Sequence, residues 1–103
     1  MREKDIEKYL CQTVERIGGQ AFKFTSPMNR GVADRVVCLP NGTVWFIEVK
    51  APDGRLTELQ KRFGQRMTNL RQNYAVLYTK EEVDEWFRTI TRLTHTPPSG
   101  CAI

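Results

Sequence analysis

The chain has 103 residues, which suffices for one domain with a modest hydrophobic core and excludes a second domain. Its 16 Lys and Arg residues against 12 Asp and Glu residues leave a formal net charge of +4, which favours a polyanionic partner but also suits an ordinary soluble protein. No stretch approaches the roughly 18 consecutive apolar residues of a membrane span. Residues 1–10 lack the apolar centre of a signal peptide, so we expect an intracellular protein with no membrane partner.

The N-terminal third predicts a helix followed by a short strand. Apolar residues recur at helical spacing and stop before Gly18 and Gly19; they are Ile6, Leu10, Val14 and Ile17. A strand is predicted over 21–24. The turn-forming residues of 25–31 predict a loop.

Two strands joined by a tight turn are predicted next. Apolar and β-branched residues fill 34–39, and the longest strand occupies 43–50. Side chains alternate along a strand, so Phe46 and Glu48 share one face of it while Ile47 lies on the other. Apolar residues on both faces are typical of a central strand covered on both sides.

The turn between these strands decides which side chains face each other. A two-residue loop would place Asp34 opposite Val49, where its carboxylate misses Glu48. A three-residue loop over 40–42 places Asp34 directly opposite Glu48. Pro40 favours the three-residue loop, because its ring presets the type I turn angle and it cannot donate a ladder hydrogen bond.

The second half of the chain predicts helix, strand and helix. Thr57 and Gln60 fit a capping box that opens a helix, whose apolar stripe is Leu59, Phe63, Met67 and Leu70. A strand follows over 74–78. Thr79 and Glu82 form a second capping box, and the stripe behind it is Val83, Trp86, Phe87, Ile90 and Leu93.

The predicted order αβββαβα indicates an α/β protein with one mixed sheet flanked by helices. We expect the domain to occupy residues 1–93 and residues 94–103 to form a flexible tail, because Pro97-Pro98-Ser99-Gly100 interrupts all periodicity.

Two carboxylates and a lysine are predicted to converge at one strand end. Asp34 and Glu48, with Cβ atoms ~5 Å apart in such a pair, repel each other unless a cation lies between them. Mg²⁺ suits this position, with Mn²⁺ as a substitute, because it binds one or two carboxylates and the carbonyl of Val49 can complete its shell. A metal activates water for attack on phosphorus, and Lys50 can hold that water or stabilise the transition state.

The spacing of these residues resembles a nuclease signature. Gly31-Val32-Ala33-Asp34, thirteen residues, then Glu48-Val49-Lys50 looks like the PD-(D/E)xK motif, and in detail like its VRR-NUC branch, the virus-type replication and repair nuclease domain. The likeness extends to about Leu93 and implies a restriction-endonuclease-like core. The resemblance implies that Asp34 and Glu48 bind the metal and that Lys50 is the catalytic lysine. It also implies that Glu7 is the acid of the first helix and Gln60 the supporting glutamine. Ala33 stands where the family usually has Pro, so we expect a looser loop with activity retained.

The residues alone leave other roles open for three of these groups. Glu7 borders the buried stripe of the first helix, and Glu3 lies on the same helix face. From the residues alone, Glu7 is equally well a site acid or a solvated acid paired with a lysine. Gln60 can cap the backbone of Thr57 or act at the site, and the two roles compete. A lone Glu-x-Lys is also a common strand-end ion pair; Asp34 at a compatible register is what favours catalysis.

Basic residues near the motif and around the second predicted helix indicate a phosphate-binding surface; they are Arg30, Arg35, Arg55, Lys61, Arg62 and Arg66. A solvated helix face explains about half of them equally well. No helix-turn-helix or zinc finger is present in the sequence, so we expect selection by nucleic-acid shape rather than base sequence.

The sequence therefore predicts an Mg²⁺-dependent endonuclease. The resemblance implies branched DNA, as for small viral resolvase-type enzymes that cut four-way (Holliday) junctions. Two symmetric cuts need two sites, hence a homodimer, with Trp86 and Phe87 either in the core or at its interface. The alternatives are a sequence-specific restriction-type endonuclease and a non-enzymatic DNA-binding protein in which Asp34, Glu48 and Lys50 form a structural cluster.

Overall fold

The computed structural model describes residues 1–25 and 31–93, with side chains as far as Thr91, so Arg30 and the predicted tail lie outside the described residues. The described elements follow the predicted order; they are α1 (Glu3–Glu15), β1 (Gln20–Lys23), β2 (Arg35–Cys38), β3 (Val44–Val49), α2 (Glu58–Asn69), β4 (Tyr74–Leu77) and α3 (Lys80–Leu93). Within these residues, no helix combines the length and apolar character needed to cross a membrane.

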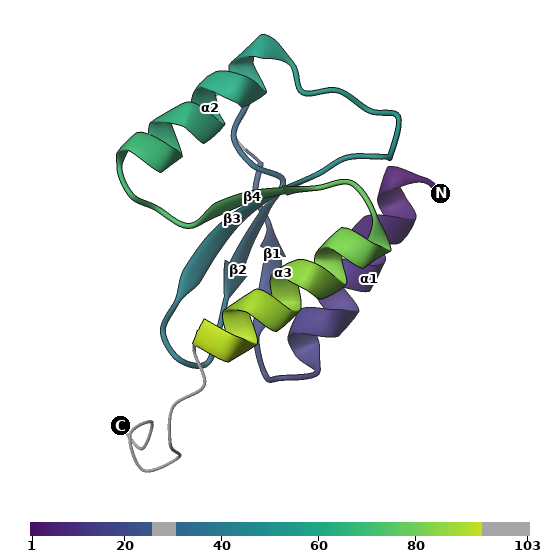
Figure 1. The fold of residues 1–103 in the computed structure, drawn as a ribbon, viewed down its shortest axis with the longest axis vertical. Coiled ribbons are helices and arrows are strands. Elements are labelled where there is room, and N and C mark those ends of the chain that lie inside the picture. Colours follow the sequence, from purple (N-terminus) through teal and green to yellow (C-terminus); the bar gives the residue numbers. More distant parts are fainter. Residues whose placement is uncertain (26–30, 94–103) are drawn as a thin grey trace.

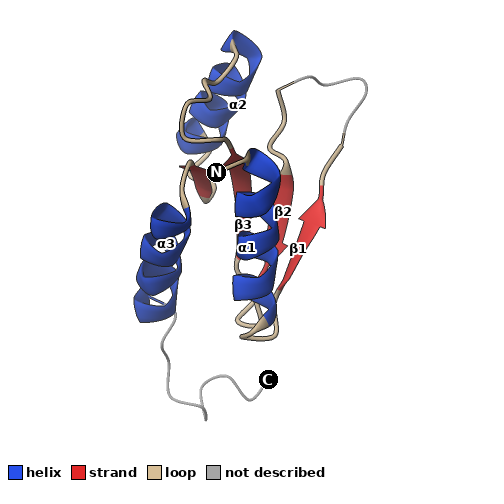
Figure 2. Cartoon of the chain, turned by 90° about the vertical axis from the view of Figure 1, so that its right-hand side faces the viewer, coloured by secondary structure: helices blue, strands red, loops and turns tan. Residues whose placement is uncertain are grey.

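A mixed sheet lies at the centre of the described residues, in the order β1-β2-β3-β4 (Figure 1). The first three strands pair antiparallel, and β4 pairs parallel to β3. Helices α1 and α3 pack side by side against one face, whereas α2 lies on the other (Figures 1 and 2). The central strand β3 is therefore covered on both faces, as its apolar sequence predicts.

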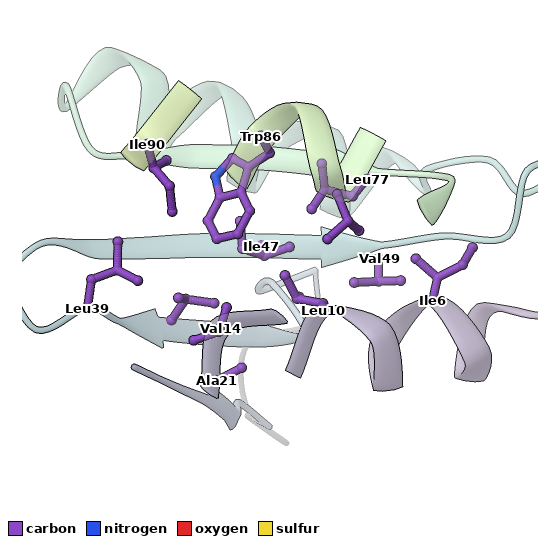
Figure 3. Close-up of a cluster of buried hydrophobic side chains, with 12 residues drawn as sticks. Ile6, Leu10, Val14, Ala21, Leu39, Ile47, Val49, Leu77, Trp86 and Ile90 are labelled. Carbon is purple, nitrogen blue, oxygen red and sulfur yellow. The ribbon is translucent and has the colours of Figure 1, made fainter. Parts of the chain in front are cut away.

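The hydrophobic core lies between the sheet and the pair α1 and α3 (Figure 3). The helices contribute side chains at helical spacing, and the strands contribute every second side chain; the largest fully buried apolar ones are Ile6, Leu10, Ile47 and Ile90. The ring of Trp86 meets Trp45 edge-on at 5.8 Å, and Trp86 is only 7% exposed. Trp86 is thus a core residue, which removes it as a candidate interface residue.

The predicted stripe of α1 is correct except at its end. Ile17 is exposed, because α1 stops at Glu15 and the chain turns through Gly18, whose φ of +85° ends the helix. Helix α1 is held to α3 by Tyr9, whose hydroxyl donates to Oδ1 of Asp84 over 2.6 Å.

Helix α2 begins with the predicted capping box, but its predicted apolar stripe is partly wrong. Leu59 and Leu70 are 43% and 59% exposed. The helix instead contacts the sheet through Phe63, which meets Phe46 and Tyr74 edge-on. The reason is that α2 packs against the β3–β4 side only, so the residues at the two ends of the stripe remain exposed to solvent.

The second capping box, at the start of α3, is displaced by one residue from the prediction. Oγ1 of Thr79 accepts from the backbone N–H of Glu82 over 3.0 Å, as expected. The Glu82 side chain, however, accepts from the N–H of Tyr78 over 2.9 Å rather than from that of Thr79. Both hydrogen bonds still satisfy backbone donors where the chain leaves β4.

The hairpin between β2 and β3 has the predicted three-residue loop. Cys38 lies opposite Val44, and the N–H of Leu39 donates to the carbonyl of Thr43 over 2.9 Å. Gly42 has a φ of +87°, the left-handed conformation that closes this turn. The ladder ends at the pair Arg35 and Ile47, one step before the predicted acids.

Candidate active site

The hairpin register brings Asp34 and Glu48 together at the open end of the β2–β3 ladder. One step beyond the pair Arg35 and Ile47, these two residues lie opposite each other. Oδ2 of Asp34 accepts a hydrogen bond from the backbone N–H of Val49 over 3.2 Å, which fixes the carboxylate against β3. The negative charge of Asp34 also acts on the carboxyl group of Glu48.

Glu48 is one of the two buried polar residues among the described part of the chain, with 1% of its surface exposed. Burial, followed by the interaction with the neighbouring carboxyl group of Asp34, raises the pKa of Glu48 to about 9, while the nearby charge of Lys50 opposes the rise. A strongly shifted acid beside a second acid and a cation is typical of functional sites.

One oxygen of Glu48 has no partner within the described residues. Its Oε1 is buried and accepts no hydrogen bond, whereas Oε2 accepts from the side-chain amide of Gln60 over 3.2 Å. A buried carboxylate oxygen without a donor is costly unless a cation or water satisfies it. This oxygen is therefore able to accept a cation or a water as its partner.

The donor set fits a hard divalent cation. It consists of two carboxylates, Asp34 and Glu48, with the backbone carbonyl of Val49 on the same strand end. No cluster of three or more Asp, Glu, His or Cys side chains suited to a metal occurs in the described residues. A cation here would therefore have few protein ligands, as Mg²⁺ usually has in sites that also use water and phosphate oxygens.

Gln60 makes the contacts of both roles that the sequence suggests as competitors. Its backbone N–H donates to Oγ1 of Thr57 over 3.1 Å, and its Oε1 accepts from the N–H of Thr57 over 2.9 Å. Its Nε2 remains free to donate to Glu48. The expected competition is wrong, because the cap uses the oxygen of the amide and the site uses the nitrogen.

Lys50 follows β3 directly and lies within electrostatic reach of two acids. Its backbone N–H donates to the carbonyl of Leu77 over 3.0 Å, so the main chain is anchored where β3 and β4 end. Its ammonium charge acts to lower the pKa of both Glu48 and Glu3. Asp34, Glu48 and Lys50, predicted to converge, thus share one electrostatic environment.

One acid of the first helix, Glu3, lies within electrostatic reach of this environment. Burial, then the negative charge of Asp34, raises the pKa of Glu3, and Lys50 opposes that shift. Glu7, which the family resemblance selects, is bound instead to Arg35: its Oε1 lies 3.3 Å from Nε of Arg35. Helical spacing places both acids on one face of α1, and only the packing of α1 on the sheet shows which turn reaches the strand end.

The predicted nucleic-acid-binding residues fall into different environments. Arg35 is largely buried, pairs with Glu7 and donates to the carbonyl of Ala21 over 3.3 Å, so its charge already has partners within the protein. Lys61 lies 3.6 Å from a carboxylate oxygen of Glu58, in an exposed pair. Arg55 is exposed.

Two exposed arginines of α2, Arg62 and Arg66, line an open groove of about 780 Å³. Apolar side chains, Phe63 and Met67 among them, form part of the same groove. It contains no acidic residue, which makes it the α2 surface best suited to a phosphate backbone.

The chain is similar to a phage protein in sequence and to a solved nuclease-type domain in structure. No family model matches the chain. It is 46% identical over 81 residues to "Putative nuclease p44" of Acyrthosiphon pisum secondary endosymbiont phage 1, and the match covers 79% of this chain and 87% of that protein. A solved structure described as "VRR_NUC domain" superposes with a TM-score of 0.78 at 28% identity, covering 84% of this chain and 94% of the other.

Proposed function

The chain belongs to the VRR-NUC nucleases, whose restriction-endonuclease-like αβββαβα fold it shares, and from that premise we propose that it is an Mg²⁺-dependent DNA endonuclease acting at Asp34, Glu48 and Lys50. The observation that carries this proposal is the buried acid pair, in which Oε1 of Glu48 lacks a partner within the described residues. Membership of a nuclease family favours this proposal over the alternative of a non-enzymatic DNA-binding protein.

The side chains of Asp34 and Glu48 and the carbonyl of Val49 would hold the cation. When bound, a divalent ion supplies positive charge that offsets the phosphate and lowers the pKa of water. The protein's own part is orientation: Val49 N–H fixes Asp34, and the Gln60 amide fixes Glu48, at 3.2 Å in each case. Rigid support of this kind keeps the acids in place without reorganisation during the reaction.

Lys50 is the proposed catalytic cation. Its ammonium group lies near both Glu48 and Glu3, so it can hold a water beside the phosphate and stabilise the negative charge that builds during in-line attack. Glu3 is the first-helix acid best placed to influence that lysine, since the charges of Asp34, Lys50 and Glu7 all act on it.

The proposed substrate is branched DNA, in particular the four-way junction, cut by a homodimer. Support comes from the family resemblance, and from the cationic α2 groove with Arg62 and Arg66, which offers phosphate contacts rather than a recognition helix for base edges. Two symmetric cuts require two sites, and this domain has one such acid pair within its described residues.

A cleavage assay on matched substrates tests the proposal. The parent protein is incubated with a labelled four-way junction and with its linear arms, in Mg²⁺, in Mn²⁺ and in EDTA. We expect the junction to be cleaved with either metal and not in EDTA, and the linear arms not to be cleaved under any of these conditions. Discrete products from the plain duplex would favour a restriction-type enzyme instead. Cleavage in the presence of EDTA would contradict the proposed metal dependence.

The Lys50→Ala variant separates catalysis from binding. We expect it to lose cleavage by about 10²-fold or more while retaining junction affinity, because Lys50 acts on the transition state rather than on the DNA as a whole. Cleavage equal to that of the parent would reject Lys50 as the catalytic residue.

Light scattering tests the proposed homodimer, because it measures the molar mass of the protein alone and of its complex with the junction.

A further inference from the structure

A second concave surface lies beside the candidate active site, between α1 and the strands β1 and β2. It is a cleft of about 510 Å³, called here the α1 cleft. Most of its lining is cationic: Arg2, Lys4, Lys8, Lys23 and Arg35. These residues come from three separate segments of the chain, which is why their convergence is not visible in the sequence.

The two acids of the α1 cleft are already neutralised. Asp5 lies 3.5 Å from Nε of Arg2, and Glu7 lies 3.3 Å from Nε of Arg35. Lys4, Lys8 and Lys23 are exposed and form no ion pair within residues 1–25 and 31–93. The cleft therefore presents a surplus of three positive charges, and a concave cationic surface concentrates the field that attracts anions.

The floor of the α1 cleft is fixed by the packed protein. The side chains of Arg35 and Glu7 are only 18% and 19% exposed, and a terminal nitrogen of Arg35 donates to the carbonyl of Ala21 over 3.3 Å. Lys23 lies opposite Arg35 in the β1–β2 ladder. A flexible solvated helix face would have no such fixed floor between two elements.

The α1 cleft adjoins the acid pair. Glu7, at its floor, follows Glu3 by about one helical turn, or ~6 Å along the axis of α1, and Glu3 is acted on by the charges of Asp34 and Lys50. Arg35 is the chain neighbour of Asp34. Glu48 of the pair accepts a hydrogen bond from Gln60, at the start of α2. The acid pair thus interacts with the first turn of α1 through charge and with α2 through this hydrogen bond.

We infer that the α1 cleft binds phosphates of the DNA strand on one side of the scissile bond, through Lys4, Lys8 and Lys23. This inference rests on the proposed function, since it assumes a nucleic-acid substrate at the acid pair. It extends the DNA-binding surface to residues that the sequence pattern alone does not single out. The lysines are positioning residues: they hold the strand in register and take no part in the reaction.

The test measures the salt dependence of binding. A fluorescent four-way junction is titrated at several salt concentrations with Lys50→Ala and with Lys50→Ala carrying Lys8→Ala and Lys23→Ala. Each lost phosphate contact lowers the slope of log affinity against log salt by about 0.9, so the expected decrease is about 2. The matched control is Arg88→Ala, which removes an exposed cation on α3 outside the cleft.

A decrease in slope for the lysine variant, with no change for the Arg88→Ala control, supports the α1 cleft. An unchanged slope in a folded variant, as judged by circular dichroism and melting temperature, overturns it. If the combined variant does not fold, Lys8→Ala and Lys23→Ala are tested singly, each with an expected decrease of about 1.

Steady-state cleavage by the two-lysine variant with Lys50 intact gives a second readout. A positioning role predicts a raised KM with kcat preserved at saturating DNA; unchanged KM would contradict it. Failure of the proposed function is separately visible, because it appears as absent metal-dependent cleavage in the parent protein, whereas the slope is measured in a variant that needs no catalysis.

Discussion

The side-chain amide of Gln60 donates to Oε2 of Glu48 over 3.2 Å while the oxygen of the same amide accepts from the N–H of Thr57. One side chain therefore fixes the first turn of α2 and orients a buried carboxylate of the sheet. Loss of the cap alone is therefore expected to affect the stability of the protein, whereas loss of the whole Gln60 side chain is expected to affect both stability and catalysis.

Replacing Gln60 by Leu tests this division against Thr57→Ala. Both changes remove capping hydrogen bonds and should lower the free energy of unfolding by about 1 kcal/mol in urea titrations. Only Gln60→Leu also deprives Glu48 of its donor, so it should reduce kcat by about tenfold or more. Equal kcat in the two variants would show that the amide acts only as a cap.

Gly64 is the position at which the ring of Tyr74 packs closely against helix α2. A Cβ at this buried position would lie 2.7 Å from Cε2 and 2.9 Å from Cζ of Tyr74. Gly→Ala inside a helix normally stabilises by about 1 kcal/mol. Here we expect Gly64→Ala to destabilise by about 1 to 3 kcal/mol, because the ring must move and α2 with it.

The matched control is Gln65→Ala, an exposed change on the same helix, whose side chain donates only to Oδ1 of Asn69 on the helix surface, over 3.0 Å. Melting temperatures of the two variants decide the outcome. A higher melting temperature for Gly64→Ala than for the parent would mean that the ring of Tyr74 yields freely.

The parts of the fold that local chemistry determines are predictable from the sequence. Pro40 and Gly42 select a three-residue loop, and that loop alone sets the register that faces Asp34 with Glu48. The capping box at Thr57 is likewise local, since its partners are three residues apart. These features need no knowledge of the rest of the molecule.

The parts that depend on packing between distant elements are not predictable in this way. Periodicity gives Glu3 and Glu7 the same face of α1, and only the placement of the helix on the sheet separates them. Leu59 has the spacing of a core residue but overhangs solvent. Arg35 is selected as a phosphate ligand because it lies near the motif in the sequence, yet in the fold it forms an ion pair with Glu7 of α1.

Glu3 and Glu7 should therefore differ in the effects of neutral substitution. Glu3→Gln removes a charge that acts near Asp34 and Lys50, so it should change kcat with little loss of stability. Glu7→Gln leaves the largely buried Arg35 without its charged partner and should lower the free energy of unfolding by about 2 kcal/mol. Cleavage kinetics together with urea denaturation separate the two. A kcat loss confined to Glu7→Gln would restore Glu7 as the helix-one acid.

Tyr74 links the packing of α2 to pH. Burial, then the negative charge of Glu48, raises the pKa of Tyr74 to about 12 from an ordinary value of 10.0. The folded state thus keeps a proton that the unfolded chain releases. The resulting contribution to stability is complete below pH 10 and is lost as the pH rises through about 12. Tyr74→Phe should lose less stability than the parent over this interval in denaturation curves. An equally steep loss in both would contradict the shift.

Glu48→Gln tests the metal site itself. In the metal-free protein, burial and Asp34 oppose ionisation of Glu48, so a neutral side chain of similar size should raise the free energy of unfolding near pH 8 by about 1 to 3 kcal/mol. In the parent, saturating Mg²⁺ should stabilise the fold, by about 2.7 kcal/mol at a hundredfold excess over Kd. The variant should lose that response together with cleavage.

Thermal unfolding in EDTA and in Mg²⁺ measures both effects in one experiment. Glu15→Gln, an exposed acid on α1, is the matched control and should respond to Mg²⁺ as the parent does. The combination of higher stability without metal and no gain with it is specific to a ligand, because a structural ion pair would be weakened by the substitution under both conditions. A Glu48→Gln variant that Mg²⁺ stabilises as strongly as the parent would exclude Glu48 from the metal site.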